Sequence, residues 1–385
     1  MNTPTDQRLN ERAARAALAT HTTPAEVGAH LPGFDAAAAW SQLTGNGRLR
    51  HFHPIPALKA AQESARFVIP GDEDWPEGLH DLGPACPFGV WVRGTAPLRP
   101  LLKRTVALVG SRAATPAAVR EAQACGYDVS AGGGTVLASL AFGVESAAHR
   151  GAGIDSGRLA VIPRGLDRCF PRAQEALMRN ILTGPGRGAV ISLYAPGTEP
   201  TALTLAASAD VTAALARAVV LVEGIHRSAS MQAAEAAQRM QRPLFALLPR
   251  DDDGYSSGNT RLIVTGRAKP CQDARAAIAA LEEVPHAAAE LVTALRAQQV
   301  TAWPDASPLA QWITVQADCH RRLRITAGHP NTQRTNYPPA EHSGWHAAEL
   351  ASGGISRTVY RSASTDLTAD TAALVSVVRQ WAAQT

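Results

Sequence analysis

The sequence has 385 residues, of which 45% are hydrophobic and 18% are charged. This composition provides enough apolar material for two or three folded domains and excludes a globally disordered chain. It offers no membrane-spanning helix, because the best apolar run, residues 218–222, is far shorter than the roughly 18 residues that a span requires. The first residues are polar and lack the apolar stretch of a signal peptide. We therefore expect a soluble cytoplasmic protein with no membrane partner.

The basic residues are almost all arginines, and this bias tells more about possible partners than the small net charge does. The net charge is +4, and only three of the 37 basic residues are lysines. Arginine forks match phosphate oxygens well, which permits an anionic partner, but a GC-rich genome would produce the same bias. The five cysteines are scattered without a Cys-x-x-Cys pair, so neither a disulfide framework nor a zinc knuckle is indicated.

Residues 1–60 are expected to form a small helical module. Residues 6–19 and 36–43 have helical composition, and Thr23-Pro24 followed by Glu26 is typical of a helix start. A lead-in over 61–104 follows. Its aromatic and proline-rich stretches at 66–76 and 87–94 predict an ordered extended segment packed on something larger.

Residues 61–285 are predicted to hold a Rossmann-like core. Short apolar runs alternate with alanine-rich helical stretches, the pattern of βαβ units with a parallel sheet covered on both faces. Right-handed crossovers then give an α/β, doubly wound fold. The expected strands are 106–109, 135–138, 159–162, 189–193, 218–223 and 244–248. The expected helices are 116–124, 146–151, 173–182, 210–216 and 230–240.

Residues 286–385 are predicted to form a separate C-terminal domain of unknown type. Helices are expected over 282–298 and 365–385. Between them lies a basic cluster with Arg321, Arg322 and Arg324, which either extends a path for DNA or faces solvent.

Polar side chains and glycines follow the predicted strands of the core. In a doubly wound fold these turns meet at one sheet edge, where glycine admits close approach and helix N-termini favour phosphate. An ordinary tight turn or a serine helix cap explains any one of them equally well, whereas together they predict a phosphate-lined groove. His149, in the second helix, is expected to be a packed core residue. The candidate nucleic-acid-binding residues are Gly110, Ser111, Arg112, Ser139, Gly143, Arg164, Gly165, Ser228 and Ser230.

In this order the motifs resemble those of the DprA/Smf family of DNA-processing proteins. The likeness covers about residues 60–275, and a collinear set of this length is more specific than any single glycine loop. The matching pieces are Gly110-Ser111-Arg112 and residues 138–149, 165–171, 223–231, 241–245 and 256–263.

The resemblance implies a protein that binds single-stranded DNA without catalysis, protects it and passes it to the RecA recombinase in natural transformation. It also implies a homodimer formed through the core, no cofactor, and phosphates held by turn amides, Ser111, Ser139 and Arg112.

One departure from the family pattern weakens this expectation. Where the family carries Arg-Asn-Arg, at the start of the helix before the fifth strand, this chain has Ser208-Ala209-Asp210. Two cations thus become a neutral residue and an acid. A nucleotide-binding sensor or a phosphoribohydrolase-like domain is the alternative, although the Pro-Gly-Gly-x-Gly-Thr loop of such hydrolases is missing at 224–229. A degenerate subunit that only binds an intact relative is a third hypothesis.

No metal site is expected. Cys319, His320, His329, His342 and His346 match no zinc spacing, although the last two would lie one turn apart on a helix. Asp251-Asp252-Asp253 is interpreted as a solvated loop.

Overall fold

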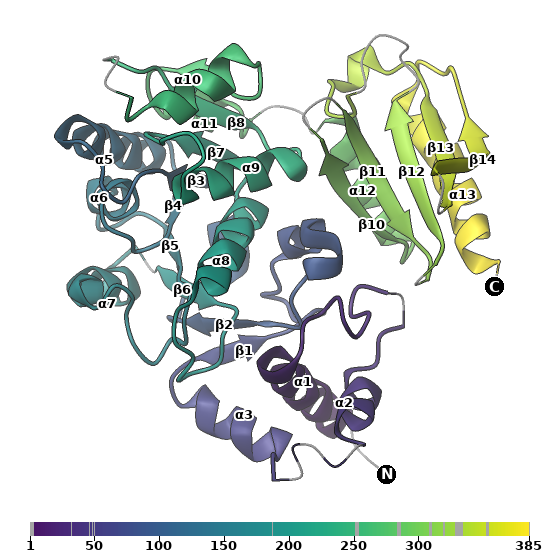
Figure 1. Ribbon diagram of the computed structural model, residues 1–385, viewed down its shortest axis with the longest axis horizontal. Helices are drawn as coiled ribbons and strands as arrows, with labels where there is room; N and C mark the ends of the chain where they lie inside the picture. Colours follow the sequence, from purple (N-terminus) through teal and green to yellow (C-terminus); the bar gives the residue numbers. More distant parts are fainter. Residues whose placement is uncertain are drawn as a thin grey trace.

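The computed structural model contains a large α/β body and a second, antiparallel sheet near the C-terminus (Figure 1). Among the described residues no helix is both long and apolar enough to cross a membrane. The structure describes residues 4–31, 33–45, 47, 49, 51–186, 188–250, 254–282, 286–307, 310–318, 320–327, 334–351 and 354–384.

The large sheet confirms the predicted doubly wound fold. Its nine strands lie in the order β1-β2-β6-β5-β4-β3-β7-β8-β9. All neighbours from β6 to β9 are parallel, whereas β1 and β2 form an antiparallel edge. The strands are β1 (Arg66–Val68), β2 (Val90–Arg93), β3 (Thr105–Val109), β4 (Thr135–Ala138), β5 (Arg158–Val161), β6 (Ala189–Ser192), β7 (Ala218–Leu221), β8 (Leu244–Leu247) and β9 (Lys269–Cys271).

The expected connecting helices are present, but α5 ends seven residues beyond the expected limit at residue 124, and α8 begins earlier than expected. We expected that helix over 210–216, but α8 (Ala202–Leu215) begins eight residues earlier, where Thr201 and Thr204 form a capping box. Residues 202–209 are rich in alanine and leucine, which favour helix from the cap onward. The others are α5 (Pro116–Ala131), α6 (Val144–Gly151), η2 (Arg172–Gln174), α7 (Glu175–Thr183), η3 (Ala229–Met231), α9 (Gln232–Arg239), α10 (Ser257–Val264) and α11 (Arg275–Ala279).

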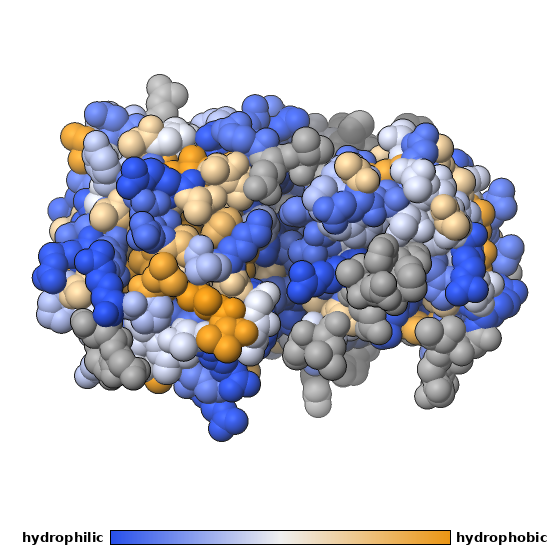
Figure 2. Space-filling view, turned by 90° about the horizontal axis from the view of Figure 1, so that it is seen from above, coloured by the Kyte–Doolittle hydropathy of each residue, from blue (hydrophilic) through white to orange (hydrophobic). Residues whose placement is uncertain are grey.

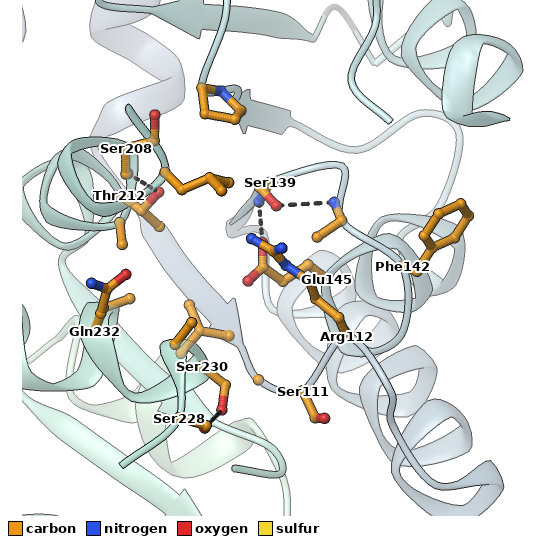
Figure 3. A pocket seen from close by; sticks show the side chains of 18 of the residues that line it. Ser111, Arg112, Ser139, Phe142, Glu145, Ser208, Thr212, Ser228, Ser230 and Gln232 are labelled. Atoms are coloured by element: carbon orange, nitrogen blue, oxygen red, sulfur yellow. Dashed lines mark hydrogen bonds between the residues drawn. The ribbon is translucent and has the colours of Figure 1, made fainter. Parts of the chain in front are cut away.

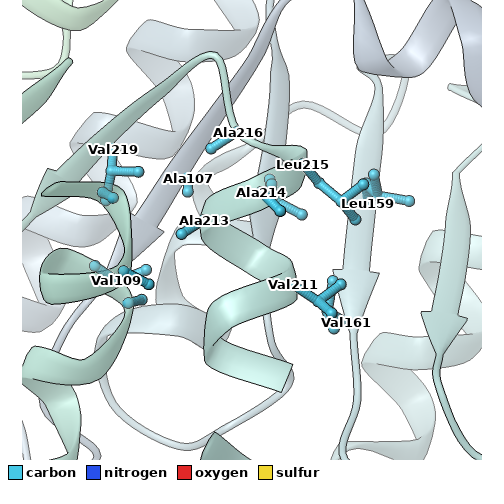
Figure 4. Close-up of a cluster of buried hydrophobic side chains, with 14 of the residues drawn as sticks. Ala107, Val109, Leu159, Val161, Val211, Ala213, Ala214, Leu215, Ala216 and Val219 are labelled. Atoms are coloured by element: carbon cyan, nitrogen blue, oxygen red, sulfur yellow. The ribbon is translucent and has the colours of Figure 1, made fainter. Parts of the chain in front are cut away.

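Helix α8 lies close against the sheet because its inner face is built from small residues. Ala213, Ala214 and Ala216 are almost completely buried over β3 and β7, while Val211 and Leu215 pack toward β5 (Figure 4). Short side chains bring the helix backbone near the strands, so their carboxyl ends and α8 can share one cavity.

The N-terminal module is joined to the lead-in by ion pairs. Asp72 accepts from Arg8 (2.8 Å) and Arg12 (2.6 Å). The predicted helix start at Thr23 is wrong: residues 24–30 form turns, because the Glu26 carboxylate accepts from the Thr22 hydroxyl and the Thr23 amide and closes a local loop. The helical elements of residues 4–104 are α1 (Pro4–His21), α2 (Ala36–Thr44), α3 (Pro54–Gln62), η1 (Glu77–Ala85) and α4 (Leu98–Leu102).

The C-terminal segment is a five-stranded antiparallel sheet whose one face is covered by two helices. Both helices were expected, but the strands were not. The division of the chain at residues 60 and 285 stays a prediction. The elements are α12 (Ala287–Ala297), β10 (Thr301–Ala306), β11 (Gln311–Gln316), β12 (Arg322–Ala327), η4 (Pro339–Glu341), β13 (Trp345–Ala351), β14 (Gly354–Arg361) and α13 (Leu367–Ala383).

A buried ion triad joins this sheet to the core. Asp81 of η1 accepts from Arg242 (2.6 Å), before β8, and from Arg296 (2.8 Å), in α12. Gln241 adds hydrogen bonds to two carbonyl groups of the C-terminal sheet, those of Asp305 and Trp312. These contacts hold the two sheets in one arrangement.

Candidate nucleic-acid interface

A cavity of about 550 Å³ lies at the carboxyl ends of β3, β4, β5 and β7. The order of strands reverses at β3, and such switch points are where doubly wound sheets bind ligands. Figure 3 shows the wall formed by α8 and α9 facing the strand-end loops. Polar lining comes from Ser111, Arg112, Ser139, Glu145, Ser208, Thr212, Ser228, Ser230 and Gln232.

The loop after β3 is held rigidly by its neighbours. Ser111 donates its amide to the Glu223 carbonyl (2.8 Å), and the buried Glu223 carboxylate accepts from the amide and hydroxyl of Thr115. Gly110 is required here because a Cβ would come within 2.7 Å of the Glu223 carbonyl oxygen. The loop therefore presents Ser111 and Arg112 in a fixed position.

Gly143 supports this loop from behind. Its φ of 75° lies in the left-handed region, and a Cβ would meet the carbonyl oxygens of Ser111 at 2.3 Å and Arg112 at 2.6 Å. Val144 then donates its amide to the Ser111 carbonyl (3.1 Å) and begins α6. Gly143 thus shapes the site without lining the cavity.

The loop after β4 places a carboxylate beside the arginine. Glu145 accepts from the Ser139 amide (2.8 Å), and Ser139 Oγ accepts from the Ala141 amide (3.0 Å). Burial raises the pKa of Glu145, while the Ser139 hydrogen bonds and the positive charge of Arg112 oppose that shift. Arg112 is exposed, extends toward Glu145 and Ser139 (Figure 3), and has no ion-pair partner within the described part of the chain. Its guanidinium donors can therefore reach a phosphate.

The serines after β7 also face the cavity. Ser228 and Ser230 share a hydrogen bond through their hydroxyls, and Ser228 donates to the Ile225 carbonyl (2.6 Å). They stand before α9, whose N-terminal Gln232 also lines the wall.

Three predicted residues lie outside the lining, namely Gly143, Arg164 and Gly165. Arg164 is buried and donates to Glu199 (3.0 Å), and its carbonyl accepts from the Ser192 hydroxyl (2.6 Å). Gly165 packs below the Ala195 carbonyl. The loop after β5 contributes apolar side chains to the cavity instead, from Pro163, Phe170 and Pro171.

The helix position that departs from the family pattern forms part of the wall. Ser208 lies in the middle of α8, and its buried side-chain oxygen has no hydrogen-bond partner among the residues that the structure describes. Asp210 points elsewhere and pairs with Arg239 of α9 (2.7 Å). The acid that replaces a family cation is therefore neutralised locally.

Sequence reasoning missed the apolar character of this site. Phe142 is 50% exposed at the cavity wall, and Leu205 and Ile225 also line it. The signal available in the sequence was Phe142, a large aromatic residue in the turn between Ser139 and Gly143. Arg112 and Glu145 are the only charged residues in the described lining.

His149 is a packed residue, as expected. It is fully buried, and its Nε2 lies 3.3 Å from the Ala138 carbonyl oxygen. Burial lowers the pKa of His149 to about 4, so the ring is neutral near pH 7.

The described residues contain no group of three or more potential metal ligands. His342 is buried between Tyr337 and Asp370, and His346 lies in β13, so the two do not share a helix turn as considered above. Cys319, His329 and Asp251-Asp252-Asp253 lie outside the described residues.

Comparisons with known proteins agree with this architecture. DNA processing protein DprA of Streptococcus pneumoniae is 31% identical over 198 residues, 51% of this chain and 67% of that protein. Protein Smf of Escherichia coli is 28% identical over 189 residues, 48% of this chain and 49% of that protein. The X-ray structure of the Streptococcus pneumoniae DprA superposes with a TM-score of 0.55 at 25% identity, covering 66% of this chain and 84% of that one.

The match spans about half the length of the Escherichia coli protein and of the curated relatives from Mycobacterium tuberculosis and Synechocystis. A family model described as DNA recombination-mediator protein A matches residues 66–282, more than half of the chain and all nine strands of the large sheet. The chain therefore belongs to the DNA recombination-mediator protein A family, also known as DprA/Smf.

Proposed function

We propose that this protein binds single-stranded DNA at the strand-end cavity and delivers it to a RecA-type recombinase, as in natural transformation. The observation that carries the proposal is the meeting of an unpaired Arg112 with the hydroxyls of Ser111, Ser228 and Ser230 at one sheet edge. The chain belongs to the recombination-mediator family and has relatives named DNA processing proteins, so DNA is the anion that we expect at this sheet edge.

The chemistry of the cavity suits an unpaired strand. Arg112 can grip a phosphate with two parallel hydrogen bonds. Amides before α9 add donors where the helix dipole favours negative charge. Phe142 and the apolar lining offer surfaces to base faces, which gives sequence-tolerant contact.

The buried carboxylate of Glu223 supports binding without catalysis. Both of its oxygens are engaged by Thr115, so it braces a loop and is not available as an acid or base. Glu145 is similarly engaged by the Ser139 amide. We infer a binding role in which the protein releases DNA unchanged.

We also propose a homodimer through the core. Leu248, Tyr255 and Val264 expose 46%, 45% and 79% of their surface; they lie directly after β8, in the turn before α10 and at the end of α10, respectively. Figure 2 looks down on the side where α10 lies and shows apolar side chains gathered on that lobe. Pairing of two copies there would cover this apolar surface.

A small nucleotide is the second candidate ligand. The cavity volume falls in the ordinary range for small-molecule sites, its lining is mostly apolar, and Ser208 offers a buried hydroxyl that lacks a partner. Such a site could hold a nucleoside between Phe142 and α8.

Fluorescence anisotropy with labelled oligo-dT at several salt concentrations tests the proposal. Arg112→Ala should weaken binding by about tenfold or more, because a charge-assisted hydrogen bond contributes about 1.5–3 kcal/mol. It should also reduce the salt slope by about one. Arg168→Ala, which removes a mostly exposed arginine outside the cavity lining, is the matched control and should bind normally.

Absence of binding at low salt would refute the DNA proposal. A thermal-shift screen of nucleotides then tests the second candidate, for which stabilisation by a nucleotide is the expected result. The recombinase step is tested by filament formation on DNA coated with a single-strand-binding protein, which the wild type should accelerate and Arg112→Ala should not.

A further inference from the structure

The C-terminal sheet has one covered and one open face. Helices α12 and α13 pack on the side of Ile313, Val315, Leu323 and Ile325, which are completely buried. Residues that alternate with these point to the other side, which is only partly covered: Thr314 and Gln316 are buried there, whereas Arg322 and Arg361 are exposed. Near β10 this second face rests against η1, where Gly83 lies under the Trp303 ring, but β11 to β14 extend beyond that contact.

The basic cluster noted in the sequence divides between the two faces. Arg321 turns to the helix side, where it stacks on Trp381 at 4.6 Å and donates to the Trp381 carbonyl. Arg322 and Arg324 lie in β12, and their side chains emerge on the open face. Only part of the cluster is therefore structural.

The open face carries an aromatic and cationic platform. The Arg324 guanidinium lies 4.4 Å from the centre of the Trp312 ring. The pairing register adds Arg361 opposite His346, and Arg322 lies two residues from Arg324 on the same strand. Arg322, Arg324 and Arg361 have no ion-pair partner among the residues that the structure describes. Because these cations are not neutralised by an ion pair, they can attract and bind a polyanion.

Few groups oppose this charge. Asp305 is the acid that the described register places on this face, beside Trp312. Burial raises the pKa of Asp305, and the positive charges of Arg324 and Arg239 oppose that shift. Near Arg322 the neighbours are Gln316 and the ring of His30, both without a negative charge. The face therefore keeps a net positive charge near pH 7.

The platform also lies close to the candidate site of the core. Gln232 lines the cavity, and Arg239 ends the same helix, α9, about 10 Å further along its axis. Arg239 is also near enough to Asp305 to influence its ionisation. Helix α9 thus spans the interval between the cavity and the sheet.

We propose that the open face of the C-terminal sheet is a second contact surface for single-stranded DNA, reached by a strand that leaves the core cavity along α9. Bases stack on the half-buried Arg324–Trp312 pair, since guanidinium planes and indoles both accept base faces. Phosphates bind Arg322 and Arg361. A broad sheet face suits unstacked bases, and the fixed junction at Asp81 keeps both surfaces available to one strand.

The proposal is tested with the full chain and labelled oligo-dT of two lengths, about 6 and about 30 nucleotides, which are short and long against an ordinary single-strand site size. The double variant Arg322→Gln/Arg324→Gln should weaken binding of the long strand by about fivefold or more and lower the salt slope by about two, with little change for the short strand. Arg357→Gln/Arg379→Gln removes equal charge from exposed arginines outside the open-face rows and should behave like wild type.

The proposal rests on the proposed function for its ligand, and the variants separate the two. If Arg112→Ala weakens both lengths but the sheet variant binds the long strand like wild type, the sheet surface is refuted and the core site stands. If only the sheet variant loses affinity, the core site fails and the sheet surface stands. Equal loss with the control double variant, or tighter binding of duplex DNA or RNA of the same length, would also overturn the proposal.

Discussion

Gly143 gives the sharpest test of how the binding loop is built. At φ 75° and ψ −130° an alanine is strained by about 1–3 kcal/mol. Its Cβ would also lie 2.3 Å and 2.6 Å from two carbonyl oxygens of the 111–112 backbone, which has no flexible end that can yield. Displacing packed backbone costs about 1–3 kcal/mol more. We therefore expect Gly143→Ala to lower the free energy of unfolding by about 2–6 kcal/mol.

Gly133 provides the matched control. It has a similar φ of 68°, but a Cβ there would meet nothing within 4 Å. Gly133→Ala should therefore cost about 1–2 kcal/mol, the backbone strain alone. Urea denaturation followed by circular dichroism measures both variants, and anisotropy measures DNA binding. Gly143→Ala should lose affinity as Arg112→Ala does, whereas Gly133→Ala should retain it. Equal destabilisation of the two variants, or normal DNA binding by folded Gly143→Ala, would refute this account of the loop.

Two further predictions concern buried charge. Asp81→Ala leaves Arg242 and Arg296 facing each other without a counter-ion, so thermal unfolding should show that the free energy of unfolding falls by about 3–5 kcal/mol. Asp81→Asn is the isosteric comparison. Wild-type stability in Asp81→Ala would contradict the junction described above. Burial lowers the pKa of His149 to about 4, below its ordinary value, so its contribution to stability is complete above about pH 6.5 and is lost as the pH falls toward 4, by about 3 kcal/mol in all. The free energy of unfolding, measured across this pH window, should depend less on pH in His149→Gln than in the wild type. If the two plots of stability against pH run parallel, the fold does not keep the His149 ring neutral.

Local pattern was sufficient for most of the core. The runs at 106–109 and 136–138 are apolar throughout because parallel strands are buried on both faces, and this signal needs no knowledge of distant residues. The strand-end motifs around Gly110 and Ser139 could be predicted for the same reason, since parallel topology brings them to one edge. The family resemblance then indicated single-stranded DNA as the ligand, which the spacing of the motifs alone could not do.

The C-terminal sheet carried a readable signal that was missed. Trp312, Ile313, Thr314, Val315 and Gln316 alternate between polar and apolar sides as a half-exposed strand does. Without a partner strand in view such a short run is ambiguous, because antiparallel pairing depends on register between segments that lie far apart in the sequence.

The sequence by itself determined the parallel sheet, its crossover helices and the position of the polar turns at the strand ends, because hydrophobic periodicity and turn chemistry are local. Tertiary structure alone decided what each side chain in those turns does. Arg164 forms an ion pair with Glu199, whereas Arg112 has no ion-pair partner among the described residues, although both residues follow a strand. Likewise Arg321 packs on Trp381 on the helix side, while Arg324 stacks on Trp312 on the other face of the sheet. Which cation is paired depends on contacts across the fold, and these contacts determine where a polyanion can bind.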